Sequence, residues 1–305
     1  MRVLIVGAGA TGIAVGVRLV RQGRDVRYLV RAGRREALQR WGAVLTAPEA
    51  RYVQEAATVL ASEISGKFDL IIVAVKAGAV DAVIEEIAPA VGAETVIIPF
   101  LNGMLHVDLL QARYPGRIVG GLIKIVASLD DQGGAVQMTS LAEITLGSLP
   151  AGPPPPWVKH TLDVAGLTVI ESVEVEQDLW EKWAFIAAAG IATCLFDNTV
   201  GNIREAGGLR YIESAIVESE RVATAAGHEP QEAAQAQARA ILTEPGSAFT
   251  SSLFRDLSAG KATEAEHILG DFARRAHELG VSTPLLDLAL VRIRAAESAR
   301  SAANR

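Results

Sequence analysis

A glycine-rich turn near the N-terminus has the spacing of a dinucleotide-binding loop. Gly7, Gly9 and Gly12 form the pattern G-x-G-x-x-G, directly after the apolar segment RVLIV and at the start of an apolar-periodic stretch. In such a turn the first glycine permits the tight bend, the second lets a pyrophosphate approach the backbone, and the third lets the helix pack on the strand. The phosphates then lie at the helix N-terminus.

The motif alone is weak, and a glycine-rich turn without a ligand is the structural alternative. The strand, turn, helix and second strand that the motif requires are all present in the pattern around it. We therefore predict a dinucleotide site at this turn. Its residues are Gly7, Ala8, Gly9, Ala10, Thr11 and Gly12.

The end of the second predicted strand indicates which dinucleotide binds. An NAD site usually places Asp or Glu about 20 residues after the motif, on the ribose 2′-hydroxyl. Here the strand runs into Arg31, with Arg34 and Arg35 close behind and no acidic residue at the strand end. A guanidinium there can pair with a 2′-phosphate. We therefore predict NADP(H), with Arg31 as its first ligand, and we expect Arg35 to point to water.

Four polar residues further along the chain could do chemistry, and each has a structural alternative. Lys76 ends the apolar segment DLIIVAVK and Asn102 follows TVIIPF, both at the carboxyl edge where ligands of open α/β sheets bind. On spacing alone, a strand end and an Asn-Gly turn explain them better. Lys182 enters an apolar helical stretch, unless it only pairs with Asp178. Glu264 begins a predicted helix, where a carboxylate suits the dipole.

Alternating β and α patterns in the first half must position these residues. The expected strands are 2–6, 25–30, 68–75 and 95–100, with helical stretches from about 12 to Gly23 and over 79–90. Continuous apolar strands alternating with helices predict a doubly wound, Rossmann-type parallel sheet. Residues 117–149 are β-rich with a turn at 130–134, and we expect antiparallel additions to the sheet edge. A short helix and a strand at 167–172 complete this part.

The second half shows only helical patterns. The expected helices are 176–197, 208–226, 231–242, 251–258, 264–279 and 284–300. Thr263 with Glu266 fits a capping box, Thr283 precedes proline at the first helical position, and Ser251 and Ser252 could cap the helix after them. We predict an NADP-binding Rossmann domain over 1–172 and an all-α substrate and closure domain over 173–305.

Composition narrows the class of protein. Lys plus Arg total 29 against 35 Asp plus Glu, a net charge of −6, which disfavours nucleic acid as a partner. One cysteine, Cys194, excludes disulfides and cysteine metal sites within the chain, and the five histidines are scattered, so we predict no metal. The N-terminus lacks the layout of a signal peptide, and the apolar run 183–196 is too short to span a bilayer. We therefore expect a cytoplasmic protein with no membrane partner.

Taken together, these residues resemble the ketopantoate reductase (2-dehydropantoate 2-reductase) family. The resemblance covers nearly the whole chain in the expected order. Its segments are GAGATG at 7–12, the arginine after the second strand, VAVKAGAV around Lys76, FLNGM around Asn102, LWEKW around Lys182, TSSLFRDLSAGKATEAEHILG at 250–270 and LGVSTP at 279–284. Any one segment is unspecific, but the ordered set favours the functional interpretation of all four polar residues.

The resemblance implies NADPH-dependent reduction of 2-dehydropantoate to pantoate, in pantothenate synthesis. It implies that Lys182 is the general acid, that Asn102 and Lys76 line the cofactor and substrate site, and that Glu264 hydrogen-bonds the substrate hydroxyl while Ser252 helps to hold its carboxylate. The chemistry agrees, because an adjacent ammonium stabilises the charge that builds on oxygen and supplies a proton. Lysine, with a pKa near ~10.4, is protonated at neutral pH.

The chain departs from the family pattern on the helix of Lys182. Family members commonly carry asparagines four and eight residues after this lysine, and Ile186 and Gly190 stand there instead. The expected pocket wall is more apolar, and fewer donors remain to select a substrate. A related reductase of another 2-oxo acid is therefore the first alternative, and a non-catalytic NADPH-binding sensor is the second. The Ala-rich helices could also form a homodimer face.

Overall fold

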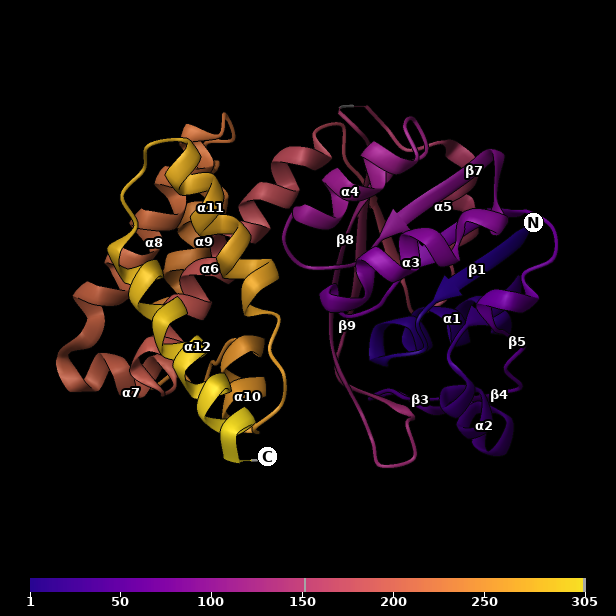
Figure 1. Cartoon of the computed structure of the whole chain (residues 1–305), viewed down its shortest axis with the longest axis horizontal. Coiled ribbons are helices and arrows are strands. Elements are labelled where there is room, and N and C mark those ends of the chain that lie inside the picture. The colour runs from indigo at the N-terminus through magenta and orange to yellow at the C-terminus, as the bar shows by residue number, and fades with distance from the viewer. Residues whose placement is uncertain (151, 304–305) are drawn as a thin grey trace. The chain divides into compact units, whose positions relative to one another are not determined.

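The computed structural model describes residues 1–150 and 152–303, and the chain divides into two compact units (Figure 1). The sheet unit comprises Met1–Leu101 and His106–Glu176. The helical unit comprises Asn102–Leu105 and the chain from Gln177 onward. The domain boundary expected at 172/173 stays a prediction, and the short segment Asn102–Leu105 was not expected to leave the sheet unit.

A five-stranded parallel sheet forms the centre of the sheet unit. Its strands, in the spatial order β5-β2-β1-β6-β7, are Thr58–Val59, Asp25–Leu29, Arg2–Val6, Phe68–Val73 and Val91–Pro99. Side chains alternate between the two faces of each strand. In β1, Val3 and Ile5 therefore join one hydrophobic core, and Leu4 and Val6 join the other. Both faces of the sheet are covered, which confirms the predicted doubly wound fold.

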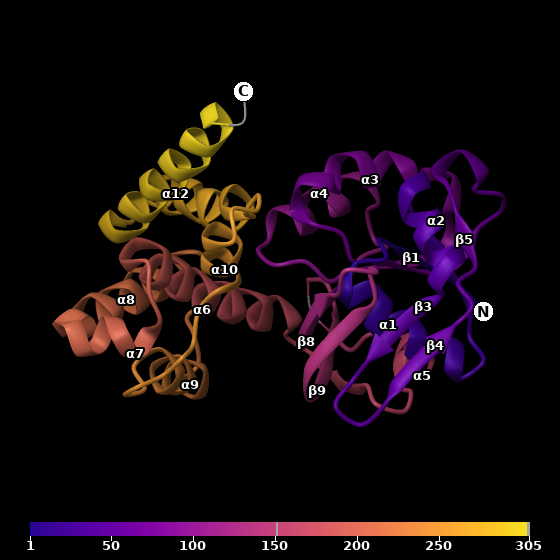
Figure 2. The same ribbon diagram turned by 90° about the horizontal axis from the view of Figure 1, so that it is seen from below.

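Helices lie on both faces of this sheet (Figure 2). The helices of the sheet unit are α1 Ala10–Arg21, α2 Ala32–Trp41, α3 Val80–Glu86, α4 Leu105–Arg113 and α5 Pro156–Leu162. Helix α1 ends as predicted at Gly23, whose φ is +73°. The N–H of Gly23 donates to Val20 and that of Arg24 to Leu19, which is the pattern of a Schellman motif. Helices α2 and α4 were not predicted.

The β-rich segment 117–149 builds a second sheet, so the prediction that it extends the edge of the first is wrong. This sheet has the order β10-β9-β3-β4, with β8 also paired to β9. Its strands are β3 Ala43–Thr46, β4 Arg51–Gln54, β8 Val119–Leu129, β9 Ala135–Ser148 and β10 Thr168–Glu171. The sequence did not reveal β3 and β4; β3 pairs with β9, and β4 pairs with β3. A parallel bridge between Ile97 and Ile118 links β7 to the residue that precedes β8.

The helical unit is built from α-helices and two π turns. Its helices are α6 Val175–Phe196, α7 Val200–Ile203, α8 Leu209–Ala225, α9 Glu232–Leu242, α10 Ser252–Ser258, α11 Asp271–Glu278 and α12 Pro284–Ala303. The π turns are Arg204–Gly208 and Glu266–Gly270. These helices confirm the predicted all-α second half, although α7 and both π turns were missed.

Helix α6 is longer than its apolar run suggested. It has 22 residues and is the one described helix that is long and apolar enough to cross a membrane by length and composition. The apolar run from Trp183 to Phe196 is too short to span a bilayer, but the helix that contains it already begins at Val175. Most of its apolar window, 67%, is buried inside the protein. An apolar helix that is mostly buried is typical of a protein core.

Two predicted helix starts have different outcomes. Thr263 and Glu266 do not form a capping box, because the carboxylate of Glu266 binds Arg294 instead and the N–H of Thr263 donates to Glu297. Pro284 does begin α12, as predicted. The carboxylate of Glu218, a residue only 7% exposed, accepts the backbone N–H groups of Leu285 and Leu286 at that helix start. Burial raises the pKa of Glu218.

Candidate functional site

The glycine loop between β1 and α1 has the backbone geometry that its motif predicts. Gly7 has φ +96°, and a Cβ on it would lie 2.7 Å from the carbonyl oxygen of Ala74. A Cβ on Gly12 would lie 2.0 Å from the carbonyl oxygen of Gly7. Gly9 is the N-cap of α1, and a Cβ there would meet nothing closer than 3.9 Å. The loop therefore needs glycine at 7 and 12 for sterics, and it leaves an open helix N-terminus of the kind that binds anions.

Lys76 follows a segment that packs against this loop. Ala74, which contacts Gly7, donates its N–H to Val6, and Val73 accepts the N–H of Phe100. Lys76 itself is exposed and is the N-cap of a 3₁₀ turn. The structure thus brings Lys76 to the edge of the sheet that carries the glycine loop, as predicted for the carboxyl ends of parallel strands.

The three arginines after β2 have three different surroundings. Arg31 is exposed and is the N-cap of α2. Arg34 donates from Nε and Nη2 to the carbonyl oxygen of Ala8, at 2.9 and 2.6 Å. The expectation that Arg35 points to water is wrong. Arg35 forms an ion pair with Glu63, which holds the pKa of that carboxyl down at about 2. Glu63 lies in a short 3₁₀ turn after β5, a turn that the sequence did not reveal.

Lys182 lies on α6 between two buried tryptophans. Trp183 is fully buried and packs edge-on against Phe272, with ring centroids 4.8 Å apart. Trp180 lies 5.0 Å from Trp183 and stacks on His228. The indole N–H of Trp183 donates to the carbonyl oxygen of Ile268 at 2.8 Å. Since this aromatic cluster fixes the rotation of α6, it also fixes the direction of Lys182.

The π turn Glu266–Gly270 connects the segments that carry three candidate residues. Its Ile268 holds Trp183, the neighbour of Lys182, and its His267 N–H donates to the carbonyl of Glu264. Gly103, which follows Asn102, has φ +87°, and a Cβ on it would lie 3.1 Å from the carbonyl oxygen of His267. The loop at 102–105 therefore packs on the helical unit. π turns inside helices are frequent at functional sites.

Helix α12 holds the segment around Glu264 in place. The backbone N–H and the hydroxyl of Thr263 both donate to Oε1 of Glu297, at 3.0 and 2.8 Å. Arg294 makes a two-bond contact with Glu266, at 2.6 and 2.7 Å, which lowers the pKa of Glu266. Two charged contacts from one helix thus flank Glu264 on both sides in the sequence.

The face of α6 that carries Lys182 becomes apolar toward its C-terminal end. Residues four apart lie on the same face of a helix, so Lys182, Ile186 and Gly190 form one row. A Cβ on Gly190 would lie 3.0 Å from Leu253 and 3.5 Å from Leu269. Leucine side chains therefore fill the space beside position 190.

The serines at the start of α10 take separate roles. Ser251 is buried, caps α10 by accepting the N–H of Phe254, and shares a hydrogen bond of 2.7 Å with Thr193. Ser252 is exposed at the first position of α10. Ser251 is thus the cap that the sequence suggested, and Ser252 keeps a side chain at the surface of the helical unit.

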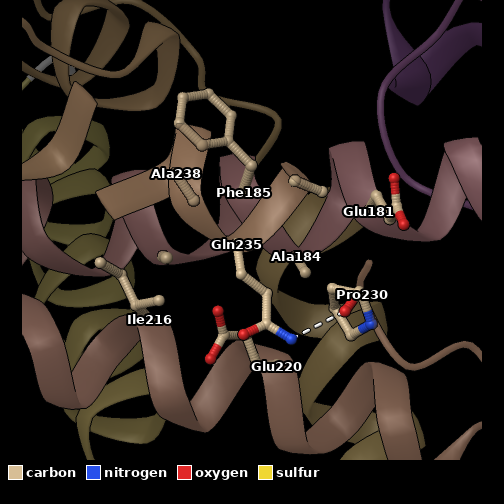
Figure 3. A pocket seen from close by; sticks show the side chains of 10 residues that line it. Glu181, Ala184, Phe185, Ile216, Glu220, Pro230, Gln235 and Ala238 are labelled. Carbon is tan, nitrogen blue, oxygen red and sulfur yellow. Dashed lines mark hydrogen bonds between the residues drawn. The ribbon is translucent and has the colours of Figure 1, made fainter. Parts of the chain in front are cut away.

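A small cavity lies beside α6, where Glu181, Ala184 and Phe185 form part of its wall (Figure 3). Its volume is about 20 Å³, and Phe185, Ile216 and Ala238 are among its lining residues. Gln235, also in its wall, donates to the carbonyl oxygen of Pro230 at 2.7 Å. The cavity has room for about one water molecule and contains none of the predicted site residues. Over the described residues, no group of three or more His, Cys, Asp or Glu could hold a metal ion.

Comparison with known proteins identifies the family. Residues 3–151 match the family described as ketopantoate reductase PanE/ApbA, and residues 174–297 match its C-terminal counterpart. An uncharacterized oxidoreductase, YkpB of Bacillus subtilis (strain 168), is 30% identical over 94% of this chain and 96% of its own length. A 2-dehydropantoate 2-reductase of Archaeoglobus fulgidus is 26% identical over 97% of this chain and 98% of its own.

A solved structure shares the fold over the full length. It is the ternary structure of D-mandelate dehydrogenase with NADH and anilino(oxo)acetate, with a TM-score of 0.86 and 21% identity, covering 99% of this chain and all of that one. The resemblance inferred from the sequence motifs is confirmed by both family matches. The chain belongs to the ketopantoate reductase (PanE/ApbA) family of oxidoreductases.

Proposed function

We propose that this protein reduces 2-dehydropantoate to pantoate with NADPH, as a step of pantothenate synthesis in the cytoplasm. One observation carries the proposal beyond family membership. The segments of Asn102, Lys182 and Glu264, which are far apart in the sequence, all pack on the π turn Glu266–Gly270 or lead into it. Chemistry-bearing residues gathered around one turn are what a substrate site requires.

The residues of the sheet unit fit a nicotinamide dinucleotide. The open helix N-terminus at Gly9 and the steric need for glycine at 7 and 12 suit a pyrophosphate. Arg31 is exposed beside the end of β2 and can reach a 2′-phosphate, while Lys76 lies at the same sheet edge. When bound, the nicotinamide supplies the hydride.

Lys182 is the proton donor in this proposal. Its ammonium delivers a proton to the carbonyl oxygen of the substrate and stabilises the negative charge there. Asn102 orients the reacting groups. Glu264 accepts a hydrogen bond from the substrate hydroxyl, and Ser252 donates one to the substrate carboxylate. The rotation of α6, fixed by Trp183, and the clamp from α12 keep Lys182 and Glu264 from turning away.

The second candidate is reduction of another 2-oxo acid with a bulkier apolar side chain. It is favoured by the leucine side chains beside Gly190, which make this side of α6 apolar where family members commonly carry an asparagine. The D-mandelate dehydrogenase complex shows that the same fold accommodates an aryl 2-oxo acid derivative. A site with fewer polar donors loses discrimination between substrates that differ in a hydroxyl.

The test is a panel of 2-oxo acids, including 2-dehydropantoate and phenylglyoxylate, with NADPH and NADH side by side. Oxidation of the reduced nicotinamide is followed by absorbance, and kcat/KM is compared. The first proposal expects the highest value for 2-dehydropantoate with NADPH. A higher value for an apolar 2-oxo acid selects the second candidate, and no turnover with any acid leaves the sensor alternative.

Lys182→Ala separates an enzyme from a sensor. We expect it to lower kcat about 10²- to 10⁴-fold, the usual contribution of a general acid, while the Kd for NADPH stays within about twofold. Lys159→Ala is the matched control, because Lys159 is a partly exposed lysine paired with Glu171. Equal turnover of the Lys182 variant would exclude Lys182 as the acid.

We further propose that the helical unit self-associates through an apolar stripe on α12. Leu288 and Val291, spaced by three, are 55% and 63% exposed, while Leu286, Leu290 and Ile293 on the other side are buried. Exposed apolar stripes of this kind mark interfaces. Light scattering after size exclusion should give a dimer that Leu288→Glu with Val291→Glu dissociates. Met138→Glu, at a residue of β9 that is 60% exposed, is the control.

A further inference from the structure

Arg34 joins the glycine loop to the turn between β8 and β9 in the second sheet. Its Nε and Nη2 donate to the carbonyl oxygen of Ala8, in the loop, at 2.9 and 2.6 Å. Its Nη2 also donates to the carbonyl oxygen of Gly133 at 2.6 Å. Gly133 lies in the turn between β8 and β9 of the second sheet. One guanidinium therefore ties the glycine loop to a hairpin about a hundred residues away in sequence.

The contact with Ala8 controls the direction of a backbone donor. A trans peptide is planar, so its C=O and N–H point in opposite directions. Because Arg34 holds the carbonyl of Ala8, it also fixes the direction of the N–H of Gly9, the N-cap of α1. N–H groups at a helix start are the donors that bind phosphate. Arg34 thus contacts the loop through a carbonyl oxygen and does not itself occupy an N–H donor of the helix start.

The β8–β9 turn is shaped around this guanidinium. Gly133 has φ +83°, and a Cβ on it would lie 2.0 Å from Nη1 of Arg34. The carboxylate of Asp130 accepts the N–H groups of Gln132 and Gly134, at 2.9 and 2.7 Å, which closes the turn. Burial lowers the pKa of Arg34, and the charge of Asp130 opposes that shift. The turn therefore supplies both the space and the charge that a half-buried arginine needs.

We propose that Arg34 is a positioning residue for the dinucleotide loop, and that the β8–β9 turn acts on the cofactor site through it. Arg34 serves the pyrophosphate, which NADPH and NADH share, whereas Arg31 serves the 2′-phosphate. The inference rests on the proposed function, because it assumes that the glycine loop binds a dinucleotide. The sequence placed Arg34 near the site but gave no sign of its partner at Gly133.

The experiment measures the Kd of both NADPH and NADH by fluorescence titration. Arg34→Ala should raise both Kd values by a similar factor of about ten, which corresponds to about 1.4 kcal/mol. Arg34→Lys should recover part of this loss, because an ammonium keeps the charge but not the fork that spans two carbonyls. Gly133→Ala, which displaces the guanidinium, should match Arg34→Ala. Arg31→Ala should raise the Kd of NADPH alone.

Each result either supports the inference or overturns it. A loss confined to NADPH in the Arg34 variants would make Arg34 a 2′-phosphate ligand, and unchanged Kd values in Arg34→Lys and Gly133→Ala would make the contact purely structural. Thermal unfolding midpoints show which variants are folded, and KM for NADPH should rise by a larger factor than kcat falls. A wild-type protein that binds neither dinucleotide would instead remove the proposed function itself.

Discussion

The glycine loop of the sheet unit and the π turn of the helical unit hold candidate residues by different means. The loop is fixed by backbone sterics: Gly12 leaves no room for a Cβ beside the carbonyl of Gly7. The π turn is fixed by side chains from distant elements, such as the indole of Trp183 and the guanidinium of Arg294. A substitution that clashes with the backbone loses the whole arrangement at once, whereas the loss of one side-chain contact removes only that contact's share of the stabilisation. Substitutions in the two regions should therefore differ in the size of their effects on stability and activity.

Gly12→Ala should give the largest effect. Its Cβ would overlap the carbonyl oxygen of Gly7, and neither backbone can move without disturbing β1. We expect a loss of about 3 kcal/mol of unfolding free energy and loss of dinucleotide binding. Denaturant unfolding measures the first and a binding titration the second. Gly33→Ala, on α2 where a Cβ meets nothing within 4 Å, should instead stabilise by up to about 1 kcal/mol.

Trp183→Phe should have the next largest effect. It keeps an aromatic ring in the cluster but removes the donor to the carbonyl of Ile268, which is buried. The expected cost is about 1–3 kcal/mol, with a fall in kcat because α6 can rotate. Trp180→Phe is the control, since Trp180 contributes ring contacts to the same cluster. An equal loss in the two variants would assign the effect to packing alone.

Glu297→Ala should have a smaller effect. It removes the acceptor of two hydrogen bonds from Thr263, directly before Glu264. We expect about 1 kcal/mol of lost stability and a several-fold lower kcat/KM. Glu278→Ala, which breaks the ion pair of Glu278 with Arg274, should leave kcat/KM unchanged. A normal kcat/KM for Glu297→Ala would show that the clamp does not position Glu264.

The smallest expected effect is on the pH dependence of stability, which should have opposite signs for Glu63 in the sheet unit and Glu218 in the helical unit. Glu63 has its pKa lowered to about 2 by Arg35, so its stabilising contribution is present above about 4.5 and is lost as the pH falls toward 2. Glu218 has its pKa raised by burial, so its contribution is present below about 4.5 and is lost as the pH rises through the folded value. Thermal unfolding of Glu63→Gln and Glu218→Gln against wild type, across pH, should give slopes of opposite sign.

The same contrast explains what the sequence could predict. The parallel sheet and the glycine loop follow from local patterns: apolar runs, glycine spacing and a left-handed residue at Gly23. The second sheet was missed because β3 and β4 are short, and their pairing depends on β9, which is distant in sequence: β3 pairs with β9, and β4 pairs with β3. The capping box at Thr263 failed because Glu297 and Arg294, distant in sequence, compete for both of its members.

Candidate site residues divide in the same way. Lys182, Asn102 and Glu264 were found as charged or polar residues next to apolar segments and through the family resemblance, and their roles stay predictions. The contacts that join their segments could not be predicted, because no local sequence pattern indicates that Gly103 packs on His267 or that Trp183 donates to Ile268. Arg34 was named among three arginines, but its contact with Gly133 depends on a hairpin in the other sheet.

The segment Asn102–Leu105 constrains how this protein can be divided. It belongs to the helical unit, although the chain on either side of it belongs to the sheet unit. The polypeptide therefore passes between the units three times, and a cut at one point near residue 173 would separate the buried Met104 from the unit to which its segment belongs. Chimeras that exchange the C-terminal half with that of a relative should carry residues 102–105 from the same donor.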